Sequence, residues 1–406
     1  NSLKLTFIIC HLLGAFGMFY FASLFWGNLG GFISSVIFLL APYQATDSFV
    51  RGAIAELLAL NIIPWVFYFL TKYIKFSKNK YLLIFSLTAL LLSHNLTSLA
   101  IAPILVVYSL ILLFQNNNLN IKGIYKLLFP VLFSIFLSAF FIIPAIYEKN
   151  LVTVETMTQG YFQYINHFAT LKQLFISRFW GFGASLWGPV DDMAFSVGLI
   201  QWLIPLIIIL YLSFKKINSL LKRKKDVLPK NTFLIILFFI FFIISLFLTH
   251  NKSTFIWKIL PFMAYYQFPW RFLLISIFTG SFISGSIITL FKKKFQLSLV
   301  VFITVITIIL NFSYFKEDIW YPNITDSQKL TKDEIIKQSG AGLKDYWPKY
   351  GQNFPITYAP NTPLIVQGEV DFIKYYKNSK FSEGYFSVFS DVATFNLPIV
   401  YFPNWI

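Results

Sequence analysis

Long apolar runs that follow one another along the chain are the feature that most constrains its fold. Crossing the hydrocarbon core of a bilayer takes about 20 apolar residues in a helix. About ten segments reach or approach this length, at roughly 5–26, 29–41, 53–71, 81–93, 96–114, 125–147, 194–214, 232–250, 272–291 and 296–315. We expect 29–41 and 81–93, which are short, to be tilted or broken helices that the protein shelters. With 57% hydrophobic and 12% charged residues, the chain is predicted to be an all-α polytopic membrane bundle.

Basic residues concentrate in four short loops between these runs. They are Lys72, Lys75, Lys78 and Lys80; Lys122 and Lys126; Lys215, Lys216, Lys222, Arg223, Lys224, Lys225 and Lys230; and Lys292, Lys293 and Lys294. The positive-inside rule places all four loops in the cytoplasm, and two predicted spans separate each loop from the next, as this topology requires. The net charge of +16 is therefore explained as a topology signal, and we discount nucleic acid as a partner.

Acidic residues show the opposite distribution. Of the 17 Asp and Glu residues, only Asp226 falls in a predicted inside loop. Acidic residues contribute little to topology themselves, so this is a separate indication that the chemistry lies on the outer face. The only cysteine, Cys10, lies in a predicted span, which excludes a disulfide framework and a thiolate metal cluster.

The composition changes after the last predicted span. Residues 316–406 are richer in polar residues, Gly, Pro and Tyr, and strand-type alternation appears in Leu364 to Tyr375 and in Tyr385 to Tyr401. We predict a transmembrane domain over 1–315, with a long outer loop at 148–193, and an exported β-rich domain over 316–406. The start at Asn1 and the end within an apparent strand predict a fragment that lacks N-terminal spans and the end of the exported tail.

Three charged residues stand between the second and third predicted spans. Asp47 and Arg51 are four residues apart, which on a helix places them within ion-pair reach. One interpretation is an interfacial pair that neutralises itself, with Arg51 reaching towards headgroups. The other is that Arg51 binds a lipid-linked phosphate through its planar fork, while Asp47 or Glu56 positions an acceptor hydroxyl or a divalent cation. Glu56 has no obvious cation nearby in the sequence.

Two further polar motifs occur at the same predicted face. His94 and Asn95 interrupt a run that is otherwise almost wholly apolar. We expect both to be buried against the protein with partners, since unpaired polar groups there are costly, with His94 either a structural residue or part of a site. Trp270 and Arg271 begin a span, and they are either an anchor pair at the headgroups or a second arginine with its neighbour in a phosphate-binding groove.

The long outer loop offers two weaker candidates. Its Trp and Gly residues could form a platform for sugar rings, and the same composition suits an interfacial aromatic belt. Asp191 and Asp192 could bind a divalent cation through oxygen ligands, or they form a solvated turn. The chain has no phosphate-cradling glycine loop, zinc-protease motif or nucleophile elbow, which argues against soluble nucleotide chemistry.

Several of these stretches resemble one family. Ala41–Tyr43 with Asp47, then Val50–Leu57, Ser93–Thr97 and Gln267–Phe272 are similar to the bacterial and archaeal membrane proteins grouped as 6-pyruvoyl-tetrahydropterin synthase-related. The resemblance covers nearly the whole chain, including the ending Tyr401–Trp405. It does not imply pterin chemistry, because the histidine cluster of that soluble zinc enzyme is not found here.

The resemblance implies a GT-C-like fold, that of polytopic glycosyltransferases that use polyprenyl-phosphate-linked sugars outside the membrane. In that superfamily an acidic residue of the first outer loop acts as base or metal ligand, and this loop would precede Asn1. Within this sequence the candidate catalytic residues are Asp47 and Glu56, with the acidic residue of that preceding loop as the rival, and the candidate substrate- or phosphate-binding residues are Tyr43, Arg51, His94, Asn95, Trp270 and Arg271.

These considerations predict a multi-pass protein of the plasma membrane with its C-terminal domain outside. It would transfer a sugar from a polyprenyl-linked donor to an envelope glycan or glycolipid. A lipid or polysaccharide transporter and a non-catalytic envelope scaffold are the alternatives. A transporter would need a polar path through the bundle, whereas the ionisable residues cluster at one face.

Overall fold

The computed structural model describes residues 2–188, 190–222, 229, 231–316, 322–340, 346–351, 359–378 and 381–403. Contacts divide the chain into two compact units. The first consists of Asn1–Ile143 and Met157–Tyr321, and the second of Pro144–Thr156 and Pro322–Ile406. The predicted outer loop 148–193 is thus divided, because its first residues belong to the second unit.

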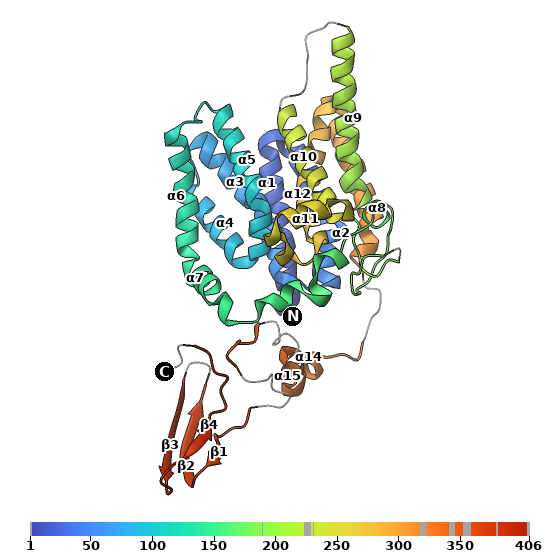
Figure 1. Cartoon of the computed structure of the whole chain (residues 1–406). Helices are drawn as coiled ribbons and strands as arrows, with labels where there is room; N and C mark the ends of the chain where they lie inside the picture. Colours follow the sequence, from blue (N-terminus) through green and yellow to red (C-terminus); the bar gives the residue numbers. More distant parts are fainter. Residues whose placement is uncertain are drawn as a thin grey trace. The chain divides into compact units, whose positions relative to one another are not determined.

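The first unit is a bundle of long helices that run side by side (Figure 1). Its helices are α1 (Ser2–Leu39), α2 (Pro42–Ala45), α3 (Ile54–Phe76), α4 (Lys80–Ser93), α5 (Asn95–Gln115), α6 (Ile121–Leu137), α7 (Ala139–Glu148, which continues into the second unit), α8 (Leu171–Phe175), α9 (Leu199–Leu221), α10 (Thr232–Thr249), α11 (Thr254–Ile259), α12 (Leu273–Ser284) and α13 (Lys293–Asn311). The shorter helical turns η1 (Thr46–Val50), η8 (Pro269–Phe272) and η9 (Gly285–Leu290) extend or connect them.

The helices confirm an all-α polytopic membrane protein. Within the described residues, 7 helices are long and apolar enough to cross a membrane, or 8 if α6 and α7, bent by 71°, form one span. Helix α1 contains two of the predicted segments, because Gly27 adopts non-helical angles (φ 70°). The Ser35 hydroxyl donates to the Ala15 carbonyl at 2.7 Å, so the two halves of α1 fold back on each other as a hairpin. The short α4 accounts for the predicted segment 81–93.

Basic loops gather at one end of the bundle. The Lys126 ammonium of α6 donates to the Ser77 hydroxyl beyond α3 at 2.8 Å, and Asn231 before α10 donates to the Phe25 carbonyl beside the α1 turn at 3.5 Å. The turn of the α1 hairpin at Gly27 lies at this end of the bundle. The second half of α1 then runs back to the opposite end, where Ala41–Glu56 lies. Of the predicted inside residues, Arg223, Lys224, Lys225, Asp226 and Lys230 lie outside the described residues.

Aromatic packing fills the centre of the bundle. The ring of Phe21 in α1 stacks on Phe282 of α12 with centroids 4.6 Å apart, and Phe238 of α10 lies 4.4 Å from the same ring. Lipid is as apolar as these side chains, so close packing rather than burial from water holds the helices together. At Gly285 a Cβ would come within 2.4 Å of the Gly30 carbonyl oxygen, and the absence of a side chain therefore permits the contact of α1 with η9.

The second unit contains the predicted β structure. It has α14 (Asp326–Lys329), α15 (Lys332–Gly340) and the strands β1 (Leu364–Gln367), β2 (Val370–Lys377), β3 (Ser382–Val388) and β4 (Thr394–Asn396). Strand β1 pairs with β4 and β2 with β3, both antiparallel. Each predicted strand region is therefore two strands, and Gly368 (φ 86°) turns the chain between β1 and β2.

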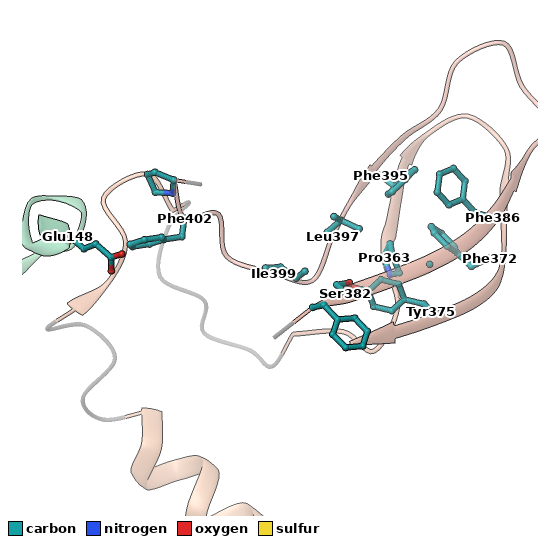
Figure 2. A pocket seen from close by; sticks show the side chains of 13 residues that line it. Glu148, Pro363, Phe372, Tyr375, Ser382, Phe386, Phe395, Leu397, Ile399 and Phe402 are labelled. Carbon is teal, nitrogen blue, oxygen red and sulfur yellow. The ribbon is translucent and has the colours of Figure 1, made fainter. Parts of the chain in front are cut away.

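Aromatic side chains line one cleft of the second unit. The cleft has a volume of about 780 Å³, and Phe372, Phe386 and Phe395 gather along it (Figure 2). A backbone hydrogen bond joins the two segments of this unit. Thr153, in the segment Pro144–Thr156, donates its backbone N–H to the carbonyl of Trp347, in the segment Pro322–Ile406, at 2.9 Å. The chain end at Asn404 and Trp405, part of the predicted family-like ending, lies outside the described residues.

Candidate functional site

The stretch between α1 and α3 forms compact irregular helix. Pro42 opens α2 at a position where its missing N–H leaves no bond unmade. The chain then widens into the π-helix η1, and Gly52, with φ 62°, turns it into α3. Single π-turns are rare and recur at functional sites. Here the wide turn carries Asp47 and ends at Arg51.

Arg51 bridges two carboxylates. Its guanidinium donates to Asp47 through Nη1 and to Glu56 Oε2 through Nη2, the latter at 2.9 Å. The Tyr43 hydroxyl donates to the other oxygen of Glu56 at 2.7 Å. Arg271 adds a second cation, with its Nε 3.4 Å from Glu56 Oε2. The expectation that Glu56 has no cation close by in the sequence is therefore wrong, since Glu56 contacts Arg51, five residues before it, and also the distant Arg271.

This charge cluster, formed by Asp47, Arg51, Glu56 and Arg271, is almost sealed from solvent. The side chains of Asp47 and Glu56 are 0% and 2% exposed, and those of Arg51 and Arg271 are 11% and 14% exposed. Two positive and two negative groups balance, which such burial requires, since removing one partner leaves a buried uncompensated charge. The headgroup-reaching interpretation of Arg51 is wrong, because both carboxylates hold its guanidinium inside the protein.

Trp270 forms one wall of the charge cluster. The Arg51 guanidinium carbon lies 4.5 Å from the centre of its ring, a cation–π contact that orients the arginine. Only 2% of Trp270 is exposed, so the interpretation of this residue as a headgroup anchor is wrong. Its indole packs beneath the arginine and against Phe268. Arg271 is fixed separately, by donation to the Tyr266 carbonyl at 2.9 Å.

His94 lies beside the charge cluster, whereas Asn95 does not. His94 caps α5, since its Nδ1 accepts from the Thr97 backbone N–H at 3.3 Å, and it lines a small cavity together with Arg271. Burial lowers the pKa of the His94 imidazole, with the Glu56 carboxylate opposing, which favours the neutral ring. Asn95 is exposed, so its predicted burial is wrong. His94 is the N-cap residue with extended backbone angles, whereas Asn95 is the first residue of α5, so the two neighbours in the sequence do not share one environment.

Several buried polar atoms at the charge cluster have no hydrogen-bond partner among the described residues. They are Asp47 Oδ2, Trp270 Nε1 and Arg271 Nε. Buried polar groups without partners are uncommon, and each indicates a place for a water or a ligand. Burial raises the pKa of the Asp47 carboxyl well above its ordinary range, the Glu56 carboxylate adds to this, and Arg51 opposes it. Asp47 therefore combines an open oxygen with an affinity for a proton.

Two buried pairs next to the charge cluster were not predicted from the sequence. The His11 Nε2 lies 2.8 Å from the Ser48 hydroxyl, and the side-chain amides of Gln44 and Asn61 donate to each other, at 3.0 Å in both directions. The sequence contained only a weak indication of these two pairs. Each of His11 and Asn61 is a single polar residue inside an apolar run, and its partner lies far away in the sequence.

The acidic pair of the long loop is held by nearby protein groups. The Ser177 hydroxyl donates to Asp191 at 2.5 Å, and the Leu186 backbone N–H donates to Asp192 at 3.2 Å. Among the residues that the structure describes, no three His, Cys, Asp or Glu side chains gather as a metal site. A divalent cation at this pair, or at the charge cluster, stays a prediction.

The aromatic residues of the loop do not favour either of their two interpretations. Trp180 packs against Tyr314, with ring centroids 5.4 Å apart, while Trp187 is 51% exposed. The first is a structural contact, and the second is available to a sugar or to the membrane interface.

Comparison with known proteins decides the family. A family model described as "6-pyruvoyl-tetrahydropterin synthase related domain; membrane protein" matches residues 1–317. The chain belongs to this family. The matched region contains the whole charge cluster, and the sequence resemblance is thereby confirmed over residues 1–317. The resemblance of the ending Tyr401–Trp405 and the GT-C-like fold stay predictions. No curated protein and no solved structure matches the chain.

Membership in the 6-pyruvoyl-tetrahydropterin synthase-related family establishes a membrane protein, in agreement with the apolar helices. What the site can do follows from its own groups. Two arginines can neutralise a phosphate, and a buried carboxyl whose pKa is raised above its ordinary value has an increased affinity for a proton.

Proposed function

We propose that the protein is a GT-C-type glycosyltransferase, which transfers a sugar from a polyprenyl-phosphate donor to an envelope glycan or glycolipid. It acts at the outer face of the plasma membrane, and the C-terminal domain is exported. The observation that carries this proposal is the buried charge cluster with its open Asp47 oxygen, which lies at the end of the bundle away from the lysine-bearing turns. Catalysts for lipid-phosphate leaving groups need this combination of fixed cations and a proton acceptor.

A groove on the lipid-facing side of the bundle supports lateral entry of the donor. It has a volume of about 740 Å³ and is lined by Leu13, Leu58, Ile62, Trp65, Phe69, Leu82, Phe85, Ser86, Ala89, Leu92 and Ser93. Nearly all these side chains are apolar, as an isoprenoid chain requires. The groove and the charge cluster share structural elements, since Leu58 lies in α3 with Glu56 and Ser93 is the last residue of α4, directly before His94.

The roles of the charged residues follow from their contacts. Both oxygens of Glu56 are engaged, by Tyr43 and by Arg51, so Glu56 holds the arginines in position. Asp47 keeps one oxygen open and is the proton acceptor. The acceptor hydroxyl oxygen attacks the anomeric carbon as its proton passes to Asp47, and the bond from that carbon to the phosphate oxygen breaks. The released polyprenyl phosphate carries the new negative charge, which Arg51 and Arg271 stabilise.

Replacement of Arg51 tests this assignment. In membranes supplied with a polyprenyl-phosphate-linked sugar, Arg51→Ala is expected to lower transfer to the acceptor at least about 100-fold, because a fixed charge that stabilises the leaving group is lost. Arg51→Lys keeps the charge but not the planar fork, and it is expected to restore part of the transfer. The measurement is incorporation of radiolabelled sugar per folded protein.

Arg178 provides the matched control. It donates to the Leu310 carbonyl and lies over Tyr314, away from the charge cluster, so Arg178→Ala is expected to retain transfer. Because loss of Arg51 leaves carboxylates without their partner, size-exclusion profiles must show that the variant is folded. A folded Arg51→Ala variant with unchanged transfer would contradict the proposed function.

A further inference from the structure

Helices α3, α4, α5 and α6 enclose an apolar cavity that the proposed function does not use. Its volume is about 440 Å³, and its lining is Val66, Leu70, Leu83, Leu87, Leu90, Leu91, Ser98, Ala102, Leu105, Val106, Ser109, Leu110, Ile124, Leu127, Leu128, Pro130, Val131, Ser134 and Ile135. Apart from three serines, every lining side chain is apolar. Along α6 the lining extends from Ile124 to Ile135, which at 1.5 Å per residue is about 16 Å.

A cavity of this kind matches a hydrocarbon chain. Its volume is about three times that of an engineered 150 Å³ apolar cavity that binds benzene. Its length is about half the thickness of a bilayer core, so one chain of a lipid fits along it. Lining side chains are themselves partly exposed at the surface, with Val106 at 58% and Ile135 at 44%, and a chain can therefore enter from the surrounding bilayer.

Lysines mark one end of this cavity. The Lys80 ammonium of α4 lies 4.7 Å from the ring centre of Phe129 in α6, and the Lys126 ammonium of α6 donates to Ser77 at 2.8 Å. The first contact joins α4 to α6, and the second joins α6 to the turn between α3 and α4, at the end where α4 and α6 begin. Lys122 lies one turn before Lys126, and it is exposed. Cavity residues follow at once, with Leu83 one turn after Lys80.

The helices around the cavity bring these lysines no acidic residue of their own. The sequence contains no Asp or Glu between Glu56 and Glu148, a stretch that supplies all four helices around the cavity apart from the first three residues of α3. In the part of the chain that the structure describes, no ion pair joins Lys80, Lys122 or Lys126 to a carboxylate. Basic pockets between membrane helices attract anionic lipid headgroups, at about 1 kcal/mol per lysine near the surface.

We propose that this cavity and its lysines form a binding site for one anionic phospholipid. One acyl chain occupies the space between α4, α5 and α6, and the phosphate headgroup lies at Lys80, Lys122 and Lys126. The site is at the opposite end of the bundle from the charge cluster. The inference is independent of the proposed glycosyl transfer, and either can fail without the other.

Native mass spectrometry of the purified full chain tests the proposal. The protein in detergent is titrated with phosphatidylglycerol or with phosphatidylcholine of the same acyl chains. We expect one phosphatidylglycerol to be retained in preference to phosphatidylcholine. In the double variant Lys80→Ala, Lys126→Ala, its affinity is expected to fall about 30-fold, since each lost lysine contributes roughly a fivefold factor.

Two matched controls distinguish specific binding at this cavity from nonspecific lipid binding. The double variant Lys292→Ala, Lys293→Ala removes lysines from another basic turn, and it is expected to bind phosphatidylglycerol as the wild type does. Ala102→Phe adds a ring to the cavity lining and is expected to displace the lipid, whereas Val107→Phe, at a position 38% exposed and not in the lining, is expected to leave it bound.

Equal retention of the two lipids would overturn the proposal, because the binding would then not depend on the charge of the headgroup. Equal weakening by both lysine double variants would also overturn it, because charge alone, without the cavity, would then explain the preference. Circular dichroism and size-exclusion profiles establish that each variant retains its fold.

Discussion

At the residue scale, three described acidic residues, Asp47, Asp191 and Asp192, have a buried oxygen without a hydrogen-bond partner, and Asp47 differs from the other two in its ion pair with an arginine. It is fully buried, it accepts from Arg51 on one oxygen, and its other oxygen is unpartnered among the described residues. A buried carboxyl with one open oxygen is disfavoured in its charged form. Glu56 is equally buried but has a partner on each oxygen, which is why we assign proton transfer to Asp47 and positioning to Glu56.

The raised pKa of Asp47 determines the pH dependence of transfer. Only the ionised carboxylate can accept a proton, so transfer is expected to rise with pH and to reach half of its maximum at a pH well above 3.8, the ordinary value for Asp. Asp47→Asn is expected to lower transfer about 10²- to 10⁴-fold, the usual contribution of a general base. The measurement is the initial rate of transfer per folded protein over a range of pH.

Conservative replacement distinguishes this role from a structural one. Asp47→Glu keeps a carboxyl group and is expected to recover part of the transfer. The pH at which transfer reaches half of its maximum is expected to differ from that of the wild type. An Asp47→Asn variant that keeps the wild-type rate and acid limb would show that the proton passes elsewhere.

At the element scale, the α1 hairpin and α3 place the charge cluster through close helix contact. A Cβ at Gly14 would come within 1.7 Å of the Asn61 side-chain oxygen, so only glycine leaves room for the reciprocal amide pair of Asn61 with Gln44. Gln44 lies in α2, three residues before Asp47. The contact of Gly14 with Asn61 therefore supports the segment that carries the acid.

Gly14→Ala is expected to destabilise this packing. The methyl group displaces Asn61 and breaks the amide pair, and overpacking of this kind costs about 1–3 kcal/mol. The measurement is the midpoint of thermal unfolding in detergent, which is expected to fall. Gly188→Ala is the control, since nothing lies within 4 Å of its added Cβ. Equal midpoints for the two variants would contradict the role of Gly14.

Sequence patterns predicted the helices and contacts that depend on residues close together in the chain. Each predicted span corresponds to a helix or half-helix, because apolar length is a property of a continuous stretch. The contact of Asp47 with Arg51 was predictable for the same reason, as the two are four residues apart. The ion pair of Arg271 with Glu56 was not, since no pattern states which helices pack together in lipid, where close fit decides.

At the scale of the whole molecule, the charges separate towards the two ends of the bundle. Lysine-bearing turns gather at one end, as the contacts of Lys126 with Ser77 and of Asn231 with Phe25 indicate, and the charge cluster lies at the other. The basic residues predicted this polarity because loop charge governs membrane insertion. The exposure of Asn95 and the pairing of His11 with Ser48 depend on helix rotation and packing, which composition does not record.

Transfer of a sugar to an envelope glycan is the central claim, and the most direct measurement is the envelope glycan profile of cells from which the gene has been deleted. Mass spectrometry is expected to show the loss of one sugar substituent, restored by a plasmid-borne wild-type copy but not by an equally abundant Asp47→Asn copy. An unchanged glycan profile after deletion, or full restoration by the Asp47→Asn copy, would contradict the account.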